Sequence, residues 1–147
     1  MENDFDKRYQ TLLVLWFALL MSIGSFFVFS LFFVPESQPV SGQPPNSLLI
    51  VVLTAPGALL VLLSFVVKHK LLERSVEKQD VSLVQKGLVF TCAMCEASAL
   101  LGLIERLTIN SRDYYLLFGF AAAGIAFHFP RRNQLEAASS RNPGQPD

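Results

Sequence analysis

The sequence predicts an all-α membrane protein, a bundle of four transmembrane helices with both chain ends in the cytoplasm. Of its 147 residues, 52% are hydrophobic and only 16% are charged, whereas soluble domains usually carry about 25% charged residues. The apolar residues also gather in four blocks, and the charges fall between them. We expect one transmembrane domain over residues 1–132, followed by a disordered cytoplasmic tail over residues 133–147.

Each apolar block is expected to be a helix, because backbone polar groups in lipid must be satisfied within their own segment. The expected helices cover residues 11–34, 47–67, 87–104 and 114–129. The first block is longer than the 7–15 apolar residues of a typical signal peptide, so we expect an anchor that is not cleaved. A soluble bundle fits less well, because neither of the first two blocks has a polar face at helical spacing.

Lys and Arg are distributed unevenly between the two sides of this bundle. Ten of the twelve precede the first block, follow the fourth, or lie between the second and third. Residues 35–46 contain none, and Arg106 and Arg112 flank the last connection. The positive-inside rule therefore predicts cytoplasmic termini. Short outer loops without glycosylation acceptor sites favour a bacterial inner membrane.

Two segments outside the apolar blocks carry further expectations. Residues 68–86 form the one sizeable cytoplasmic connection, which we expect to be a solvated linker. Short amphipathic helices near anionic headgroups are the alternative for the same residues. Glu105 and Arg106 are expected to anchor a helix end at the membrane interface.

Glu96 is the most informative residue, because it is the one charged residue inside the third block. A charge at bilayer mid-depth costs at least ~2.5–3.5 kcal/mol and is a functional hypothesis by default. In the structural interpretation, burial keeps the carboxyl neutral and a neighbouring helix supplies its hydrogen bond. The donors available for that bond are Thr54, Ser64, Ser22 and Ser25.

In the functional interpretation, Glu96 binds and releases a proton or a cation. Pro56 interrupts the second block and removes one backbone hydrogen bond there. If this kink faces Glu96, the freed carbonyl of Val52 becomes a partner for the ion. Glu96, Thr54 and Pro56 are therefore the candidate ion-binding residues.

Small residues predict where helices approach closely in lipid. The third block has a row of them through Cys95, Ala99 and Gly102, and the fourth includes Gly119 and Ala123. We expect these two helices to pack together, within one chain or between chains. The first two blocks carry larger Leu, Phe and Val side chains, which suit contact with lipid.

One segment of the third block runs Glu96-Ala97-Ser98-Ala99-Leu100-Leu101-Gly102-Leu103. It resembles the carboxylate-bearing helix of subunit c, the proteolipid of rotary ATP synthases. The resemblance implies that Glu96 carries an ion. It is confined to this segment, because the Gly-x-Gly-x-Gly run and the Arg-Gln-Pro loop of that family are absent from the sequence.

Cys92 and Cys95 form a Cys-x-x-Cys pair, which raises a membrane thiol-redox enzyme as a further class. That chemistry needs an accessible thiol and a second redox pair, and the chain has no other cysteine. We expect both to be packing residues, with no metal and no cofactor, because His69 and His128 do not complete a ligand set. The formal net charge is zero and no basic patch is present, which argues against nucleic acid.

The sequence therefore predicts a non-enzymatic subunit or self-associating component of a membrane complex. Its expected partners are the lipid bilayer and further copies or other chains. The alternative is proton or cation translocation by Glu96. A thiol-redox enzyme is the third possibility. Hydrolytic catalysis is not expected, because the parts of a hydrolytic site are missing from the sequence.

Overall fold

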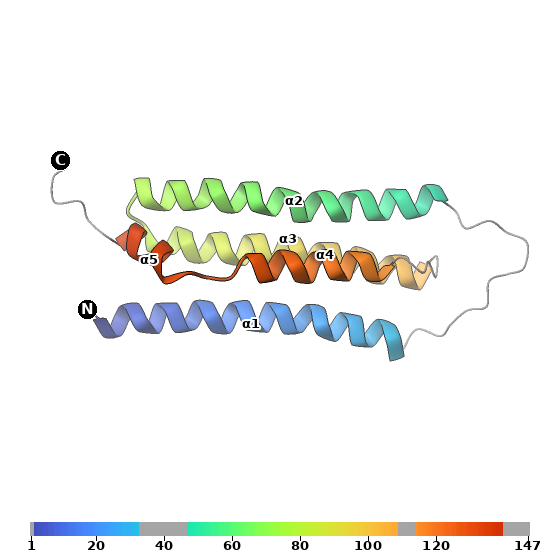
Figure 1. Cartoon of the computed structure of the whole chain (residues 1–147), viewed down its shortest axis with the longest axis horizontal. Helices are drawn as coiled ribbons and strands as arrows, with labels where there is room; N and C mark the ends of the chain where they lie inside the picture. Colours follow the sequence, from blue (N-terminus) through green and yellow to red (C-terminus); the bar gives the residue numbers. More distant parts are fainter. Residues whose placement is uncertain (1, 33–46, 109–113, 140–147) are drawn as a thin grey trace, which may run out of the picture.

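The protein is described from a computed structural model, which covers residues 2–32, 47–108 and 114–139. Helices take up 94% of these residues and no strand occurs among them, which confirms the all-α class. The structure has five helices in the described residues, and Figure 1 shows the long ones lying along one axis with a short helix at one end. Their bounds are α1 (Glu2–Phe32), α2 (Ser47–Glu77), α3 (Val81–Thr108), α4 (Tyr114–Phe127) and α5 (Arg132–Ser139).

Three of these helices, α1, α2 and α3, are long and apolar enough to cross a membrane. Their outward faces expose large apolar side chains, such as Phe17, Leu62 and Phe90. Contiguous apolar surface of this kind marks contact with another protein or with a membrane. The helix α4 is also apolar but shorter, and its 14 residues rise only about 21 Å.

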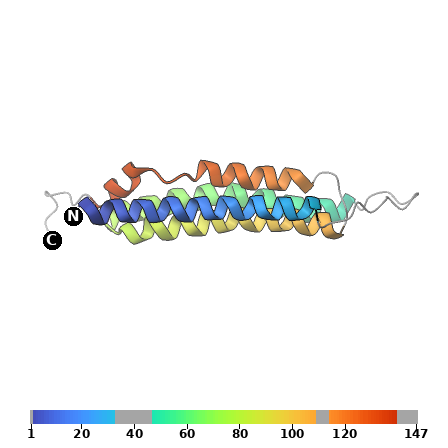
Figure 2. The ribbon, with the colours of Figure 1, turned by 90° about the horizontal axis from the view of Figure 1, so that it is seen from below.

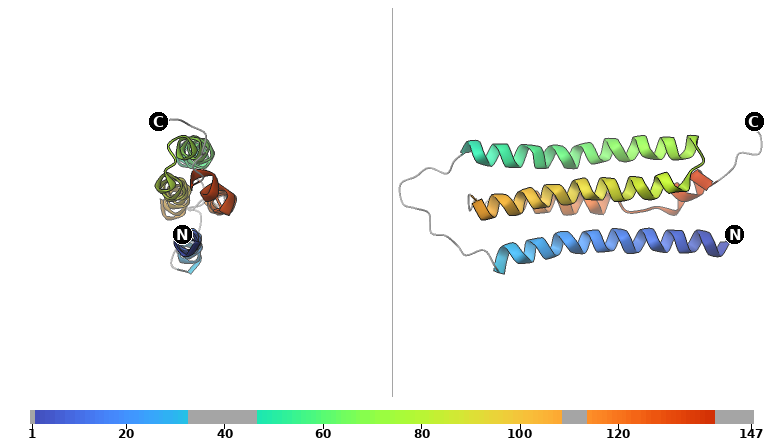
Figure 3. Two further views of the ribbon diagram at one scale, coloured as in Figure 1. Left: turned by 90° about the vertical axis from the view of Figure 1, so that its left-hand side faces the viewer. Right: turned by 180° about the vertical axis from the view of Figure 1, so that it is seen from behind.

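The helix α3 lies at the centre of the bundle. In its apolar window 44% of the residues are buried, against 11% in α1 and 17% in α2. The end-on view in Figure 3 places α3 and α4 side by side between α2 and α1. The helix α3 packs against both α2 and α4, and α1 and α2 direct most of their large side chains outward.

The connection between α2 and α3 differs from the linker expected over residues 68–86. The helix α2 continues to Glu77 and α3 begins at Val81, so only residues 78–80 lie between them. Both interpretations of this segment, a solvated linker and separate surface helices, are therefore corrected. Residues 68–77, which place Leu71, Leu72 and Val76 among charged residues, extend α2 beyond its apolar block, and residues 81–86 extend α3.

The turn itself is closed by hydrogen bonds at both helix ends. Gln79 has a φ of 51°, and the N–H groups of Gln79 and Asp80 donate to the carbonyls of Val76 and Ser75. These two bonds are the Schellman pattern that ends many helices. The Asp80 carboxylate then accepts the N–H of Ser82 at 2.8 Å and caps the start of α3.

The helix α5 corrects the expectation that the chain is disordered from residue 133. Its Leu135 and Ala138 are buried. Arg132 donates to the Asp6 carboxylate at 3.1 Å, and its guanidinium lies 5.0 Å from the centre of the Tyr9 ring. Figure 2 shows α4, the connecting stretch and α5 following one another along the bundle. Residues 140–147, like the loops expected at 35–46 and 109–113, lie outside the described residues.

Candidate functional site

Buried residues recur along α3 at alternating intervals of three and four residues. This is the spacing of helices that wind around each other with a left-handed supercoil. Near the start of α3 the row consists mainly of apolar residues, and further along it consists of small and polar ones. Its members are Val84, Leu88, Thr91, Cys95, Ser98, Gly102 and Glu105.

A matching row on α2 faces this one in a fixed register. The Thr54 hydroxyl lies 3.3 Å from Oε2 of Glu105 and donates to it. Ten residues further along α2, the Ser64 hydroxyl lies 3.6 Å from the Cys95 sulfur, which is ten residues back along α3. The two helices therefore pair antiparallel over this whole length. We use the name polar seam for the side chains gathered here from three segments, namely Thr54, Ser64, Cys95, Ser98, Glu105 and His128.

Glu105 forms the end of the polar seam nearest the α3–α4 connection. Its side chain is fully buried, so the expected role as an interfacial anchor is corrected for this residue. One carboxyl oxygen has Thr54 as its donor, and the other, Oε1, has no hydrogen-bond partner among the described residues. The neighbouring Arg106 guanidinium instead stacks over Tyr114, 5.1 Å from the ring centre.

His128 forms the opposite end, just beyond α4. It is fully buried, with Nε2 lying 2.8 Å from the Ser64 hydroxyl. That hydroxyl donates to the Val61 carbonyl at 2.6 Å, so it accepts its second bond from the Nε2–H of His128. Nδ1 is left as a buried acceptor without a partner within the described chain.

Three glycines let α4 close over the polar seam. A Cβ atom at Gly124 would lie 2.8 Å from the Cys95 sulfur, and one at Gly57 would lie 2.7 Å from a methyl of Leu117. At Gly102 the added atom would lie 3.0 Å from Cβ of Leu117. These contacts are too close for any larger residue without movement, so the glycines set the distances between α2, α3 and α4.

The structure separates the three residues expected to bind an ion. Thr54 bonds Glu105, which is nine residues from Glu96, or about 13 Å along the helix axis. Pro56 is exposed on α2, and so is Val52. Glu96 follows Cys95, so it projects about 100° away from the polar seam.

Glu96 itself is half-buried near the middle of α3. Its Oε1 atom is buried and finds no hydrogen-bond partner in the described part of the chain. Three of the four expected donors have other acceptors, since Thr54 bonds Glu105, Ser64 bonds Val61, and Ser25 bonds the Met21 carbonyl. The structural interpretation therefore lacks its expected donors within one chain.

The small residues expected at helix contacts divide into two groups. Cys95, Ala99 and Gly102 are fully buried inside the bundle. Gly119 and Ala123 are exposed on α4, and a Cβ atom at Gly119 would meet nothing within 4 Å. Both α4 residues therefore lie on the outer surface of the described bundle.

Sequence reasoning missed two members of the polar seam. Glu105 continues the row of small residues by one more step of three after Gly102, so extending the row would have found it. The pairing of His128 with Ser64 joins two helices and has no sequence signal. Neither cysteine is disulfide-bonded, and the described residues contain no cluster of three His, Cys, Asp or Glu that could hold a metal. No family model, curated protein or solved structure matches this chain.

Proposed function

We propose that the protein is a non-enzymatic subunit of a membrane assembly in which a second chain supplies the hydrogen-bond partner of Glu96. All four apolar segments cross the bilayer, with both chain ends in the cytoplasm. One observation carries the proposal: Glu96 lies at mid-length of α3 and is only half-buried, so part of an ionisable side chain faces away from the described bundle, while its buried Oε1 has no hydrogen-bond partner among the described residues. Ionisable residues within a membrane almost always pair with one another or face a bundle interior.

The crossing by the fourth segment is supported by the residues that follow α4. The helix rises about 21 Å, and residues 128–131 add roughly 10 Å, which together match a hydrocarbon core of about 30 Å. Irregular backbone at membrane depth must be buried in protein. His128 and Pro130 are buried, and the N–H of Phe129 donates to the carbonyl of Ala126.

Side chains of other helices also bind the last carbonyls of α4. Trp16 on α1 donates its indole N–H to the Ile125 carbonyl at 2.7 Å. Lys68 on α2 donates to the Phe127 carbonyl at 3.5 Å. The Ile125 carbonyl also accepts the N–H of His128, directly beyond the helix. The last carbonyls of a helix lack partners within it, so the contacts of Trp16 and Lys68 support the early end of α4 inside the bundle.

The hydrogen-bonding groups of the Glu96 side chain favour a protein neighbour over lipid alone. A neutral carboxyl carries one donor and several acceptor positions, and lipid chains can satisfy neither. Hydrogen bonds between membrane helices contribute about 0.6 kcal/mol on average and up to about 1.7 kcal/mol. Such a bond adds specificity to an assembly whose remaining contacts are between apolar side chains.

The oligomeric state of Glu96 variants in lipid nanodiscs tests this function. Glu96→Leu removes the bond and should shift the assembly to monomers, while Glu96→Gln keeps a donor and an acceptor and should assemble like the wild type. Circular dichroism establishes that both variants remain helical. If Glu96→Leu assembles as completely as the wild type, the proposed function is wrong.

Proton or cation translocation is the second candidate. One observation favours it, because α3 carries two carboxyl groups, Glu96 and Glu105, each with a buried oxygen that lacks a partner among described residues. The same Glu96→Gln variant separates the two functions, since it should assemble normally. Loss of ion flux in proteoliposomes by this assembled variant would establish translocation, and unchanged flux would exclude a carrier role for Glu96.

A further inference from the structure

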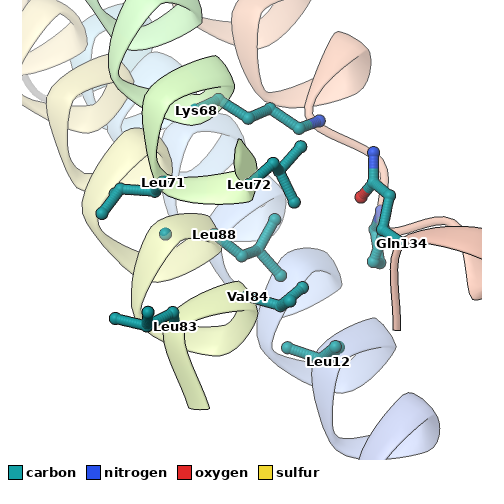
Figure 4. A pocket seen from close by; sticks show the side chains of 10 residues that line it. Leu12, Lys68, Leu71, Leu72, Leu83, Val84, Leu88 and Gln134 are labelled. Carbon is teal, nitrogen blue, oxygen red and sulfur yellow. The ribbon is translucent and has the colours of Figure 1, made fainter. Parts of the chain in front are cut away.

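A small cavity lies near the cytoplasmic ends of the helices, where α5 meets the bundle. Its volume is about 10 Å³, and the lining residues come from α1, α2, α3, α5 and the connection between α4 and α5. Most of the wall is leucine and valine, including Leu12, Leu72 and Leu88. The polar side chains of the lining are Lys68 and Gln134, and Figure 4 shows Lys68 extending from α2 toward Gln134.

Lys68 has little to balance its charge at this position. It is half-buried, and its hydrogen bond to the Phe127 carbonyl is long, at 3.5 Å. Arg131 directly follows Pro130, a lining residue of the cavity, so a second positive charge lies beside Lys68. No carboxylate among the described residues forms an ion pair with either cation. Two neighbouring cations without an acid repel each other, and an anion between them would remove that repulsion.

The depth of Lys68 matches the boundary of the hydrocarbon core. It is the first charged residue after the apolar block 47–67, and 21 residues from the start of α2 correspond to about 32 Å. A core of about 30 Å therefore ends close to the Lys68 ammonium. Lipid phosphates lie immediately outside that boundary, and anionic lipids attract basic residues there.

We propose that Lys68, Arg131 and Gln134 bind the phosphate group of an anionic lipid at the cytoplasmic rim of the bundle. Ammonium and guanidinium groups form charge-assisted hydrogen bonds with phosphate oxygens, and the Gln134 amide adds neutral donors. Exposed apolar side chains just inside the boundary, such as Val66 and Phe127, match an acyl chain, which a free phosphate ion lacks. This inference rests on the membrane topology proposed above.

Native mass spectrometry of the full chain, released from detergent with added lipid, tests the site. The wild type should retain phosphatidylglycerol at lower concentrations than phosphatidylcholine. Lys68→Gln should weaken phosphatidylglycerol binding about tenfold, the effect expected for losing one charge-assisted hydrogen bond. Lys70→Gln is the matched control, because it removes the same charge from an exposed position two residues away and should leave binding unchanged.

A second variant keeps the test decisive if Lys68→Gln fails to fold. Arg131 is exposed, so Arg131→Gln should fold normally and also weaken phosphatidylglycerol binding. Equal loss with Lys70→Gln would overturn the site in favour of general attraction to the basic rim. Displacement of the lipid by inorganic phosphate at equal concentration would overturn the lipid assignment. The same spectra report the number of chains in each complex, so the lipid site and the proposed assembly can fail separately.

Discussion

The two carboxyl groups of α3 have different surroundings, although they belong to one helix. Glu105 is fully buried in the polar seam with Thr54 as a donor. Glu96 is half-buried, outside that seam, and the described chain gives its buried oxygen no donor. Because Glu105 already has a donor within the bundle, we assign Glu105 to the bonding between α2 and α3. We assign Glu96 to the proposed contact with another chain.

Thr54→Val should destabilise the bundle by about 0.6–1.7 kcal/mol, from the average to the largest contribution of hydrogen bonds between membrane helices. The change preserves the shape of the side chain and leaves the buried Glu105 carboxyl without its donor. Thr11→Val is the matched control, because that hydroxyl is exposed and bonds a carbonyl of its own helix. Unfolding in mixed detergent micelles measures the free energy of unfolding of both variants. Equal values for the two variants would contradict the role of Thr54.

At the scale of single elements, the glycines of α4 have opposite roles. A Cβ atom at Gly124 would lie 2.8 Å from the Cys95 sulfur and 3.1 Å from Val61, whereas one at Gly119 would meet nothing. Gly124→Ala should therefore cost about 1–3 kcal/mol through overpacking. Gly119→Ala should be neutral or stabilising, because alanine favours helix. A larger stability loss for Gly119→Ala in unfolding experiments would contradict this packing.

The exposed side of α4 should matter for assembly and leave the fold unchanged. Ala123→Leu adds a large side chain where the chain itself has open space, so the monomer should keep its stability. If α4 contacts the second chain, the same variant should disrupt oligomers in nanodiscs. Gly102→Leu is the contrast, since a Cβ atom at Gly102 would already lie 3.0 Å from Cβ of Leu117, and this variant should unfold the monomer. If Ala123→Leu leaves the oligomers unchanged, α4 is not part of the interface with the second chain.

The turn between α2 and α3 should be sensitive to acid through Asp80. The Ser82 hydroxyl and backbone N–H donate to its carboxylate, which holds the pKa of Asp80 below its ordinary value of 3.8. Its stabilising effect is thus complete above pH 3.8 and is lost as the pH falls through the lowered pKa. Asp80→Asn still caps α3 and should flatten this acid response. Helical circular dichroism of both proteins, measured against pH, checks this prediction. An acid transition that Asp80→Asn leaves unchanged would contradict it.

The elements also show how far the sequence leads. The apolar blocks predict the cores of α1, α2 and α3, because helices in lipid are long and uniformly apolar. The turn at residues 78–80 was missed, since helix ends outside lipid depend on caps such as Asp80 rather than on hydropathy. The helix α5 was missed because it is short and polar, and it depends on contacts of Arg132 with α1.

For the whole molecule, thiol labelling in sealed vesicles should report the proposed topology. Cys92 and Cys95 are fully buried, so they should stay unlabelled and provide a silent background. Lys78→Cys should react only from the cytoplasmic side, and Thr108→Cys only from the opposite side, because α3 connects them across the bilayer. Labelling of both from one side would contradict the topology. Rapid labelling of the native cysteines would favour the thiol-redox class.

The central claim is that a second chain covers Glu96, and its reaction with a hydrophobic carbodiimide tests this most directly. The reagent modifies protonated carboxyl groups that are accessible from lipid, and peptide mass spectrometry locates the modification. Glu96 should be protected in native membranes and modified once detergent has dissociated the assembly, while the fully buried Glu105 stays unmodified in both samples. Equal modification of Glu96 in native membranes and in dissociated monomers would contradict the claim.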